Sequence, residues 1–161
     1  MPFTVRKTPD KGLGVFAEAP VPKDSVIWRH LPHQFEVLDE QTLTDRLANL
    51  PREDAVYLLT HVVSMGEFPG FMINVLDEGA LFNHADQPNV KRKCMASEYQ
   101  GPIITSSLEV CDALLDSHFD LIAASNIAVG DELLMDYEDE PDDPGYYEAA
   151  CERFGITWEW L

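Results

Sequence analysis

The sequence predicts a mainly β fold with a helical insert, because strand-like segments occupy both ends of the chain and helical patterns fill its middle. The strand-like segments are short, apolar or alternating, and bounded by turn residues. They are 3–6, 15–17, 26–28, 71–76, 121–124 and 132–137. We therefore expect the two ends to supply the sheets of the fold and the middle to supply its helices.

The helical insert is predicted at about residues 40–65. Thr42 and Asp45 have the spacing of a capping box, which places the start of the first helix at Thr42. The apolar face of this helix repeats at helical intervals: Leu43, Leu47 and Leu50. Pro51 interrupts the pattern and begins a second one. The second face is Val56, Leu59 and Val63. Both faces are expected to pack in the core.

A last helix is predicted near the C-terminus. Asp143 and Pro144 have the character of an N-cap and a first helical position, and Gly155 that of a C-terminal stop. The stretch 98–117 gives no clear pattern. We expect one domain over residues 1–140, followed by an aromatic C-terminal segment over residues 141–161.

The charge of the chain bears on its partners. Its 161 residues include 29 acids and 11 bases, giving a formal net charge of −18. A surface this negative repels nucleic-acid phosphates and attracts cationic partners such as a Lys/Arg-rich peptide. The acidic run 138–143 would add to that attraction. The alternative is that the acidity only keeps the protein in solution.

Cysteine usage and hydropathy indicate a soluble, intracellular protein. The three cysteines, Cys94, Cys111 and Cys151, are widely spaced and form no CxxC pair, so neither a zinc site of the usual spacing nor a disulfide framework is expected. The first twelve residues lack the apolar stretch of a signal peptide. No apolar run approaches the ~20 residues of a membrane helix.

The segment Gly12 to Ala17 reads Gly-Leu-Gly-Val-Phe-Ala. Two glycines one residue apart allow a tight turn and a close approach of a ligand to the backbone. The third glycine of the dinucleotide-binding fingerprint is missing and no βαβ pattern follows, which excludes that motif. Taken alone, the segment is either a plain turn or a ligand contact.

Two further segments concentrate polar side chains. Residues 81–89 read LFNHADQPN, in which Asn83 and His84 offer several hydrogen-bond donors and acceptors. Residues 127–137 read IAVGDELLMDY, a turn followed by a strand that ends in Asp-Tyr. Taken separately, the first is also explained as a polar turn with a buried histidine, and the second as a surface hairpin with a packed Tyr137.

In this order and at these separations, the three segments resemble the SET domain, a protein-lysine methyltransferase family. The family has a GxG followed by a small apolar run, then Asn-His-Ser-x-x-Pro-Asn, and finally I-x-x-G-E-E-L-x-x-D-Y. The resemblance covers residues 11–22, 79–89 and 121–137. It implies a β-clip-like fold of small curved sheets with a C-terminal pseudo-knot, through which the Asn-His segment passes.

The resemblance also implies an activity. S-adenosyl-L-methionine would be the cofactor, and the methyl acceptor would be the side-chain amine of a lysine in a basic protein or peptide. Cofactor and peptide would bind on opposite faces, joined by a narrow channel for the lysine. The residues implied to contact the cofactor are Gly12, Leu13, Gly14, Asn83 and His84. Tyr137 matches the catalytic tyrosine, and no metal is implied.

The chain departs from the family pattern at several places. Ala85 replaces the usual serine, and Met135 replaces the Phe or Tyr that often governs how many methyl groups are added. The zinc-binding C-terminal module of many members is absent. In its position, Trp158 and Trp160 either close the substrate channel, where aromatic faces favour a cation, or pack the last helix onto the core. The leading hypothesis is an active lysine methyltransferase, and the main alternative is a catalytically inactive SET-fold module that binds basic peptides. A third reading is a methyltransferase that acts on a non-histone protein or a small amine.

Overall fold

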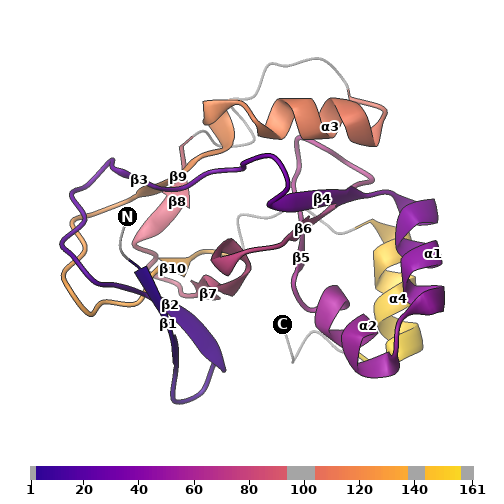
Figure 1. Cartoon of the computed structure of the whole chain (residues 1–161), viewed down its shortest axis with the longest axis horizontal. Coiled ribbons are helices and arrows are strands. Elements are labelled where there is room, and N and C mark those ends of the chain that lie inside the picture. Colours follow the sequence, from indigo (N-terminus) through magenta and orange to yellow (C-terminus); the bar gives the residue numbers. More distant parts are fainter. Residues whose placement is uncertain (1–2, 94–103, 138–143, 157–161) are drawn as a thin grey trace.

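The computed structural model describes residues 3–93, 104–137 and 144–156. Within these residues, short strands form four small sheets (Figure 1). The strands are β1 (Phe3–Lys7), β2 (Leu13–Ala17), β3 (Val26–Trp28), β4 (Phe35–Leu38), β5 (Val62–Ser64), β6 (Met72–Val75), β7 (Asn83–His84), β8 (Val90–Arg92), β9 (Leu121–Ala123) and β10 (Leu134–Met135). The helices are α1 (Glu40–Asn49), α2 (Arg52–Leu59), α3 (Ser107–Leu114) and α4 (Gly145–Phe154), with short 3-10 turns η1 (Glu78–Leu81) and η3 (Ser117–Phe119). The prediction of a mainly β fold with helices in its middle is confirmed.

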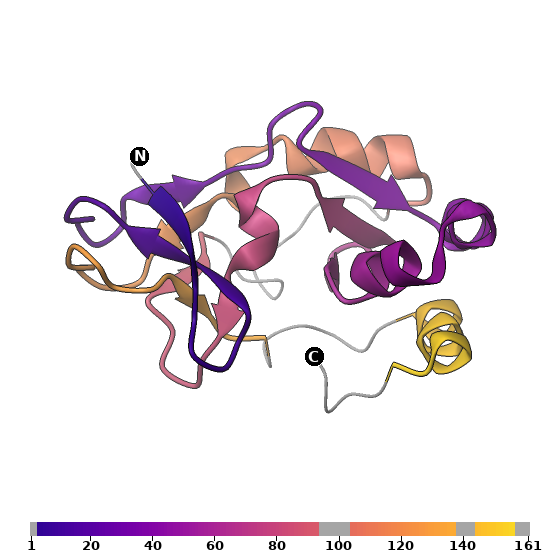
Figure 2. The same ribbon diagram turned by 60° about the horizontal axis from the view of Figure 1, so that its bottom comes forward.

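The sheets and helices occupy different parts of the molecule. Strands β1 and β2 form an antiparallel hairpin, and two three-stranded antiparallel sheets have the orders β4-β6-β5 and β3-β9-β8. Helices α1, α2 and α4 gather at one end, while β1, β2, β7 and β10 lie toward the other (Figure 1). Turning the molecule shows the same separation (Figure 2).

The pairing of β7 with β10 is parallel. Asn83 lies opposite Leu134, and His84 lies opposite Met135. Two backbone hydrogen bonds extend the pairing, from the N–H of Ala85 to the carbonyl of Met135 at 2.8 Å and from Asn89 to Leu134 at 3.1 Å. The Asn-His segment therefore lies directly beside the final motif.

The side chain of Asn89 supplements this pairing. Its Nδ2 donates to the carbonyl of Glu132 at 2.7 Å, and its Oδ1 accepts from the N–H of Leu134 at 2.9 Å. One amide thereby satisfies both a donor and an acceptor of the neighbouring backbone, as a strand residue would. On its other side, the final motif is bonded to β2, where Leu133 N donates to Val15 O at 2.8 Å. All three sequence motifs are joined by backbone hydrogen bonds.

Helix α1 begins earlier than predicted. Its N-cap is Asp39, whose carboxylate accepts a hydrogen bond from the N–H of Thr42 at 2.8 Å. Hydrogen bonds from the side chain and the backbone of Thr42 lower the pKa of Asp39. The expectation that Thr42 begins the helix is wrong, because Asp39 has the same three-residue spacing to Thr42 and the extended backbone that an N-cap requires. Leu43 and Leu47 are buried as expected.

Helix α2 follows Pro51 as predicted but ends at Leu59. Val63 was expected on its apolar face and instead lies in β5, opposite Ile73 of β6. The hydroxyl of Thr60 donates to the carbonyl of Val56 at 3.0 Å, satisfying a group at the helix end. The following residues then pair with the edge of β6 as strand β5. The predicted helical insert therefore ends in a sheet.

Helix α4 closes the core at the helical end of the molecule. Gly155 ends it in the left-handed region at φ 74°, as the sequence predicts, while its N-cap is Pro144 and Asp143 lies outside the described residues. Tyr147 and Cys151 are buried in a cluster with residues of α1 and α2. The Tyr147 hydroxyl donates to the carbonyl of Leu59 at 2.6 Å.

Two other segments differ in part from their predictions. The strand expected over 132–137 is confined to Leu134–Met135, because residues 131–133 are bonded to β2 instead. The ambiguous stretch 98–117 contains α3, which packs against β4. No helix of the described ranges is long and apolar enough to cross a membrane.

Replacing Tyr147 with Phe should lower the free energy of unfolding by about 1–2 kcal/mol, because the buried carbonyl of Leu59 loses a hydrogen-bond donor without gaining water. Chemical denaturation measures the change. Tyr57→Phe, on an exposed side chain of α2, is the matched control and should stay within about 0.5 kcal/mol of wild type. Equal stabilities for the two variants would contradict the role given to the Tyr147 hydroxyl.

Candidate functional site

The glycine motif forms the turn into β2 and the start of that strand. Gly12 has φ 77°, in the left-handed region that favours glycine. Gly14 is required for a different reason: a Cβ at this position would lie 2.3 Å from Oε1 of Glu132 and 2.9 Å from Nδ2 of Asn83. The absence of a side chain at Gly14 lets the three motifs meet.

The side chain of Asn83 is held by hydrogen bonds to the other two motifs. Its Nδ2 donates to the carbonyl of Leu13 at 2.9 Å and to Oε1 of Glu132 at 2.7 Å. These bonds use the donors of the amide and fix its plane, leaving Oδ1 as the acceptor. A fixed amide oxygen beside a carboxylate suits a ligand group that carries N–H bonds.

Lys11 and His84 link the hairpin to the Asn-His segment. The Lys11 ammonium donates to the carbonyl of His84 at 2.6 Å. Nδ1 of the His84 ring accepts from the backbone N–H of Tyr137 at 3.1 Å, and Nε2 lies 3.3 Å from a carboxylate oxygen of Asp86. An accepting Nδ1 carries no proton, so this network assigns the ring proton to Nε2. The ring of His84 therefore positions the backbone of Tyr137.

Tyr137 follows β10 and reaches back across β7. Its hydroxyl donates to the carbonyl of Phe82, and the residue is 41% exposed. Phe82 and Asn83 are consecutive, and successive side chains of extended chain point to opposite sides. Asn83 faces the glycine motif, whereas Phe82 faces a cavity. The Tyr137 hydroxyl thus lies where these two sides meet.

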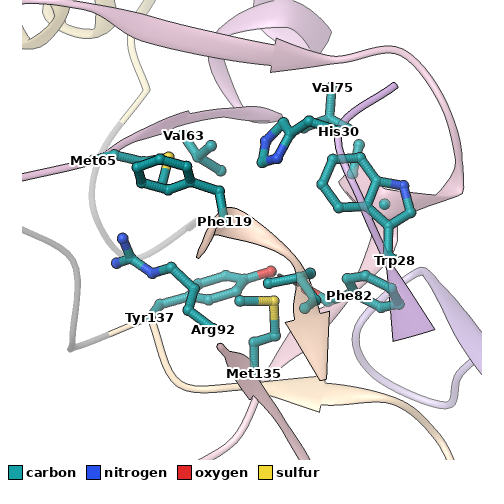
Figure 3. Close-up of a pocket in the computed structure, with 13 residues that line it drawn as sticks. Trp28, His30, Val63, Met65, Val75, Phe82, Arg92, Phe119, Met135 and Tyr137 are labelled. Carbon is teal, nitrogen blue, oxygen red and sulfur yellow. Dashed lines mark hydrogen bonds between the residues drawn. The ribbon is translucent and has the colours of Figure 1, made fainter. Parts of the chain in front are cut away.

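The cavity on the Phe82 side has a volume of about 80 Å³, enough for several water molecules (Figure 3). Met135 and Tyr137 line it from the final motif. The other apolar and aromatic walls come from elements far apart in the sequence: Trp28, Val63, Met65, Val75, Phe82, Phe119 and Leu121. Such walls exclude water from an occupant and favour a flat or linear apolar group.

Two polar side chains in the cavity wall are paired. The indole Nε1 of Trp28 lies 3.0 Å from both carboxylate oxygens of Asp77, and Gly79 leaves room for the indole, because a Cβ there would lie 2.6 Å from it. Arg92 is ion-paired with Glu67 at 3.2 Å, and their side chains are 10% and 1% exposed. The pairing offsets the charge of Arg92 within the wall.

His30 is the third polar group of the wall. It follows β3, is 9% exposed, and packs edge-on against Trp28 and Phe35 with ring centroids 4.5 and 5.2 Å apart. Within the described part of the chain, its Nδ1 is buried without a hydrogen-bond partner. Burial lowers the pKa of His30 from 6.5 to about 4, since removal from water disfavours the charged ring. The imidazole is neutral near pH 7.

The sequence-predicted residues fall into two groups. The structure brings together the five residues expected at the cofactor, at the junction of β2 and β7, and it places Tyr137 and Met135 at the adjoining cavity. Trp158, Trp160 and the acidic run 138–143 lie outside the described residues.

Sequence reasoning missed other residues of the site. Lys11 and Glu132 were inside the quoted segments, Lys11 directly before Gly12 and Glu132 two residues after Gly130, and their polar character was the available signal. Trp28, His30 and Arg92 carried no signal, since only the folded chain brings them to one cavity.

No cluster of three or more His, Cys, Asp or Glu side chains within 3–93, 104–137 and 144–156 is arranged to hold a metal ion. Cys111 is half-buried and Cys151 is buried, and within the described residues neither forms a disulfide. Burial and the neighbouring Asp112 raise the pKa of the Cys111 thiol. Cys94 lies outside the described residues.

Comparison with known proteins identifies the fold. The family model of the SET domain matches residues 12–138, whereas no curated protein matches the sequence. A solved structure described as a candidate histone methyltransferase of Plasmodium falciparum is 19% identical, with a TM-score of 0.48, over 84% of this chain and 91% of that one. The Neurospora SET-domain protein DIM-5, a histone lysine methyltransferase, is 16% identical, with a TM-score of 0.52, over 88% of this chain.

The chain spans about half, 54%, of the Neurospora chain. At 16% identity, the likeness to the Neurospora protein concerns the fold. The family match extends from the glycine turn at Gly12 past Tyr137, and so includes all three motifs that the structure joins. This chain belongs to the SET-domain family.

Proposed function

We propose that this protein transfers a methyl group from S-adenosyl-L-methionine to the side-chain amine of a lysine in a basic protein or peptide. The observation that carries the proposal is the position of the Tyr137 hydroxyl. It is bonded to the Phe82 carbonyl between a polar cluster at Gly14 and Asn83 and an aromatic cavity. A methyl donor on one side and an amine on the other would meet at these two oxygens.

The polar cluster suits the cofactor. S-adenosyl-L-methionine, when bound, supplies an electrophilic methyl group on a sulfonium. Asn83 would offer Oδ1 to an N–H group of that molecule, and the turn at Gly12 to Gly14 would offer backbone groups. Glu132 fixes the Asn83 amide at 2.7 Å, so the acceptor needs no reorganisation on binding.

The cavity suits a lysine side chain. Its walls would contact the four methylene groups, and burial of those groups favours entry. A free lysine has a pKa near ~10.4, and its amine must lose a proton before it can attack carbon. A largely apolar cavity disfavours the ammonium form, because little in the wall replaces its hydration. The position of the lysine amine in this cavity would thus help keep it neutral and nucleophilic.

The two oxygens at the junction suit the transferring methyl. A hydroxyl and a carbonyl can hold a polarised methyl group through weak C–H···O contacts. His84 holds the Tyr137 backbone, and the parallel pairing holds Phe82, so both oxygens sit on anchored chain segments. Alignment of amine, methyl and leaving group then supplies much of the acceleration through positioning.

The charge of the chain favours a basic substrate. A formal net charge of −18 would increase the encounter rate with a Lys/Arg-rich peptide. A transfer assay with radiolabelled cofactor on an array of lysine peptides, followed by mass spectrometry, tests the proposal. Label on lysine is the expected result. Cofactor binding without label on any peptide would leave the inactive peptide-binding module as the better description.

Replacing Asn83 with Ala should weaken cofactor binding by roughly 1–3 kcal/mol, because a fixed acceptor is lost and Glu132 is left without its partner. Isothermal titration with S-adenosyl-L-methionine measures the change. Asn74→Ala is a matched control, since that half-buried amide on β6 also donates to a carboxylate but lies away from the glycine motif. Unchanged affinity in a folded Asn83 variant would remove this residue from the cofactor site.

Replacing Tyr137 with Phe should lower kcat by roughly 10²-fold, as for other donors or acceptors that act mainly in the transition state. Cofactor affinity and the unfolding midpoint should stay near those of wild type. The measurement is steady-state turnover on the peptide found in the array. A variant with full turnover would show that Tyr137 is only a packed aromatic residue.

A further inference from the structure

The hydrogen bond between His84 and the backbone of Tyr137 depends on the charge of the histidine ring. The backbone N–H of Tyr137 donates to Nδ1 of His84 at 3.1 Å. A backbone N–H always donates, so this bond forms only while Nδ1 keeps its lone pair and the imidazole is neutral. Histidine side chains as a class change charge between about pH 5 and pH 8. The anchor of the Tyr137 backbone therefore rests on a group that can take up a proton.

Protonation of Nδ1 removes this anchor. Both nitrogens of an imidazolium are donors, so the ring N–H and the N–H of Tyr137 would face each other at 3.1 Å with no acceptor between them. A carboxylate oxygen of Asp136 lies 3.8 Å from the same Nδ1, where a small movement brings it within reach of the new N–H. The neutral ring of His84 thus has one partner in the Tyr137 backbone, and the protonated ring has another in Asp136.

The charged groups around His84 act on its protonation in opposite directions. Oδ1 of Asp86 lies 3.3 Å from Nε2, and this carboxylate and that of Asp136 both favour the imidazolium. The Lys11 ammonium, bound to the carbonyl of His84, disfavours a second positive charge. The Tyr137 phenol, with its ring centroid 5.4 Å away, is neutral. The Asp86 side chain is 95% exposed and screened by water, whereas that of Asp136 is 32% exposed. Among the described residues, Asp136 is thus the partner best placed to hold a protonated ring.

We propose that His84 is a positioning residue whose neutral imidazole holds Tyr137 in place for methyl transfer, and that protonation turns the ring to Asp136 and releases Tyr137. The inference rests on the proposed function and concerns the same site. The hydroxyl of Tyr137 reaches the Phe82 carbonyl from a backbone that the ring anchors, so loss of the anchor displaces the hydroxyl. The site is assembled when His84 is neutral and is switched off when His84 is protonated.

NMR titration of the wild-type chain tests the switch without catalysis. The ring nitrogen resonances of His84 report which nitrogen carries a proton, and the backbone amide resonance of Tyr137 reports its hydrogen bond. The neutral ring should carry its proton on Nε2, and on acidification the Tyr137 amide should shift with the same midpoint as the ring. The proposal is overturned by a neutral ring protonated at Nδ1, by a Tyr137 amide that does not follow the ring, or by a ring that stays neutral down to about pH 5.

Variants separate the titrating anchor from the volume of the side chain. His84→Asn places an amide oxygen near the position of Nδ1, and this acceptor does not titrate, so the Tyr137 amide should lose its response to pH. Asp136→Asn removes the carboxylate that holds the protonated ring, so the midpoint should move to lower pH. His61→Asn, on a ring bonded to the carbonyl of Tyr57 in α2, is the control and should titrate as wild type. A pH response that survives in His84→Asn, or an unmoved midpoint in Asp136→Asn, would contradict the mechanism.

Turnover connects the switch to the proposed function. Acid also slows transfer by protonating the substrate amine, and this loss is common to wild type and His84→Asn. Each protein is therefore normalised to its own kcat at high pH. One pH unit below the midpoint measured for His84, protonated rings outnumber neutral ones about tenfold, so kcat should fall roughly tenfold further in wild type than in His84→Asn. Equal falls would overturn the role of His84 in positioning. If wild type transfers no methyl group, the proposed function fails, and the NMR titration still decides the switch.

Discussion

The parallel pairing of β7 with β10 is the constraint on which the rest of the site depends. It sets Asn83 opposite Leu134 and His84 opposite Met135, although the two segments are far apart in the sequence. Parallel neighbours cannot be joined by a tight turn, so the intervening chain must leave and return. That chain supplies β8, α3 and β9, and β9 in turn provides part of the cavity wall.

A second consequence of this pairing is the division of the site into two sides. Extended chain at Phe82 and Asn83 sends one side chain into the apolar cavity and the next to the glycine motif. Gly14 must lack a side chain so that Asn83 and Glu132 can approach the glycine motif on the polar side. Gly79 must lack one so that Trp28 can fit on the apolar side. Tyr137 joins the two sides, with its backbone held by His84.

Local signals predicted the elements that local chemistry determines. The strand at 26–28 follows from stiff, β-branched side chains. The break between the first two helices follows from the missing N–H of Pro51, and the end of α4 follows from the freedom of Gly155 to adopt a left-handed conformation. The start of α1 was misplaced because Asp39 and Thr42 are both good caps, and only the fold decides which one is used. Val63 was misassigned because the edge of β6, distant in sequence, recruits it into a sheet. Likewise, the motifs predicted the polar side of the site, whereas Trp28, His30 and Arg92 reach the cavity through tertiary packing alone.

The central claim is that the three motifs form one cofactor site that adjoins the aromatic cavity. The most direct measurement is the change in backbone amide resonances of the wild-type chain when S-adenosyl-L-methionine is added. The account predicts shifts concentrated at Gly12, Gly14, Asn83, His84 and Tyr137, with α1 and α4 unaffected. Shifts confined to the helical end of the molecule, or no shifts at saturating cofactor, would contradict it.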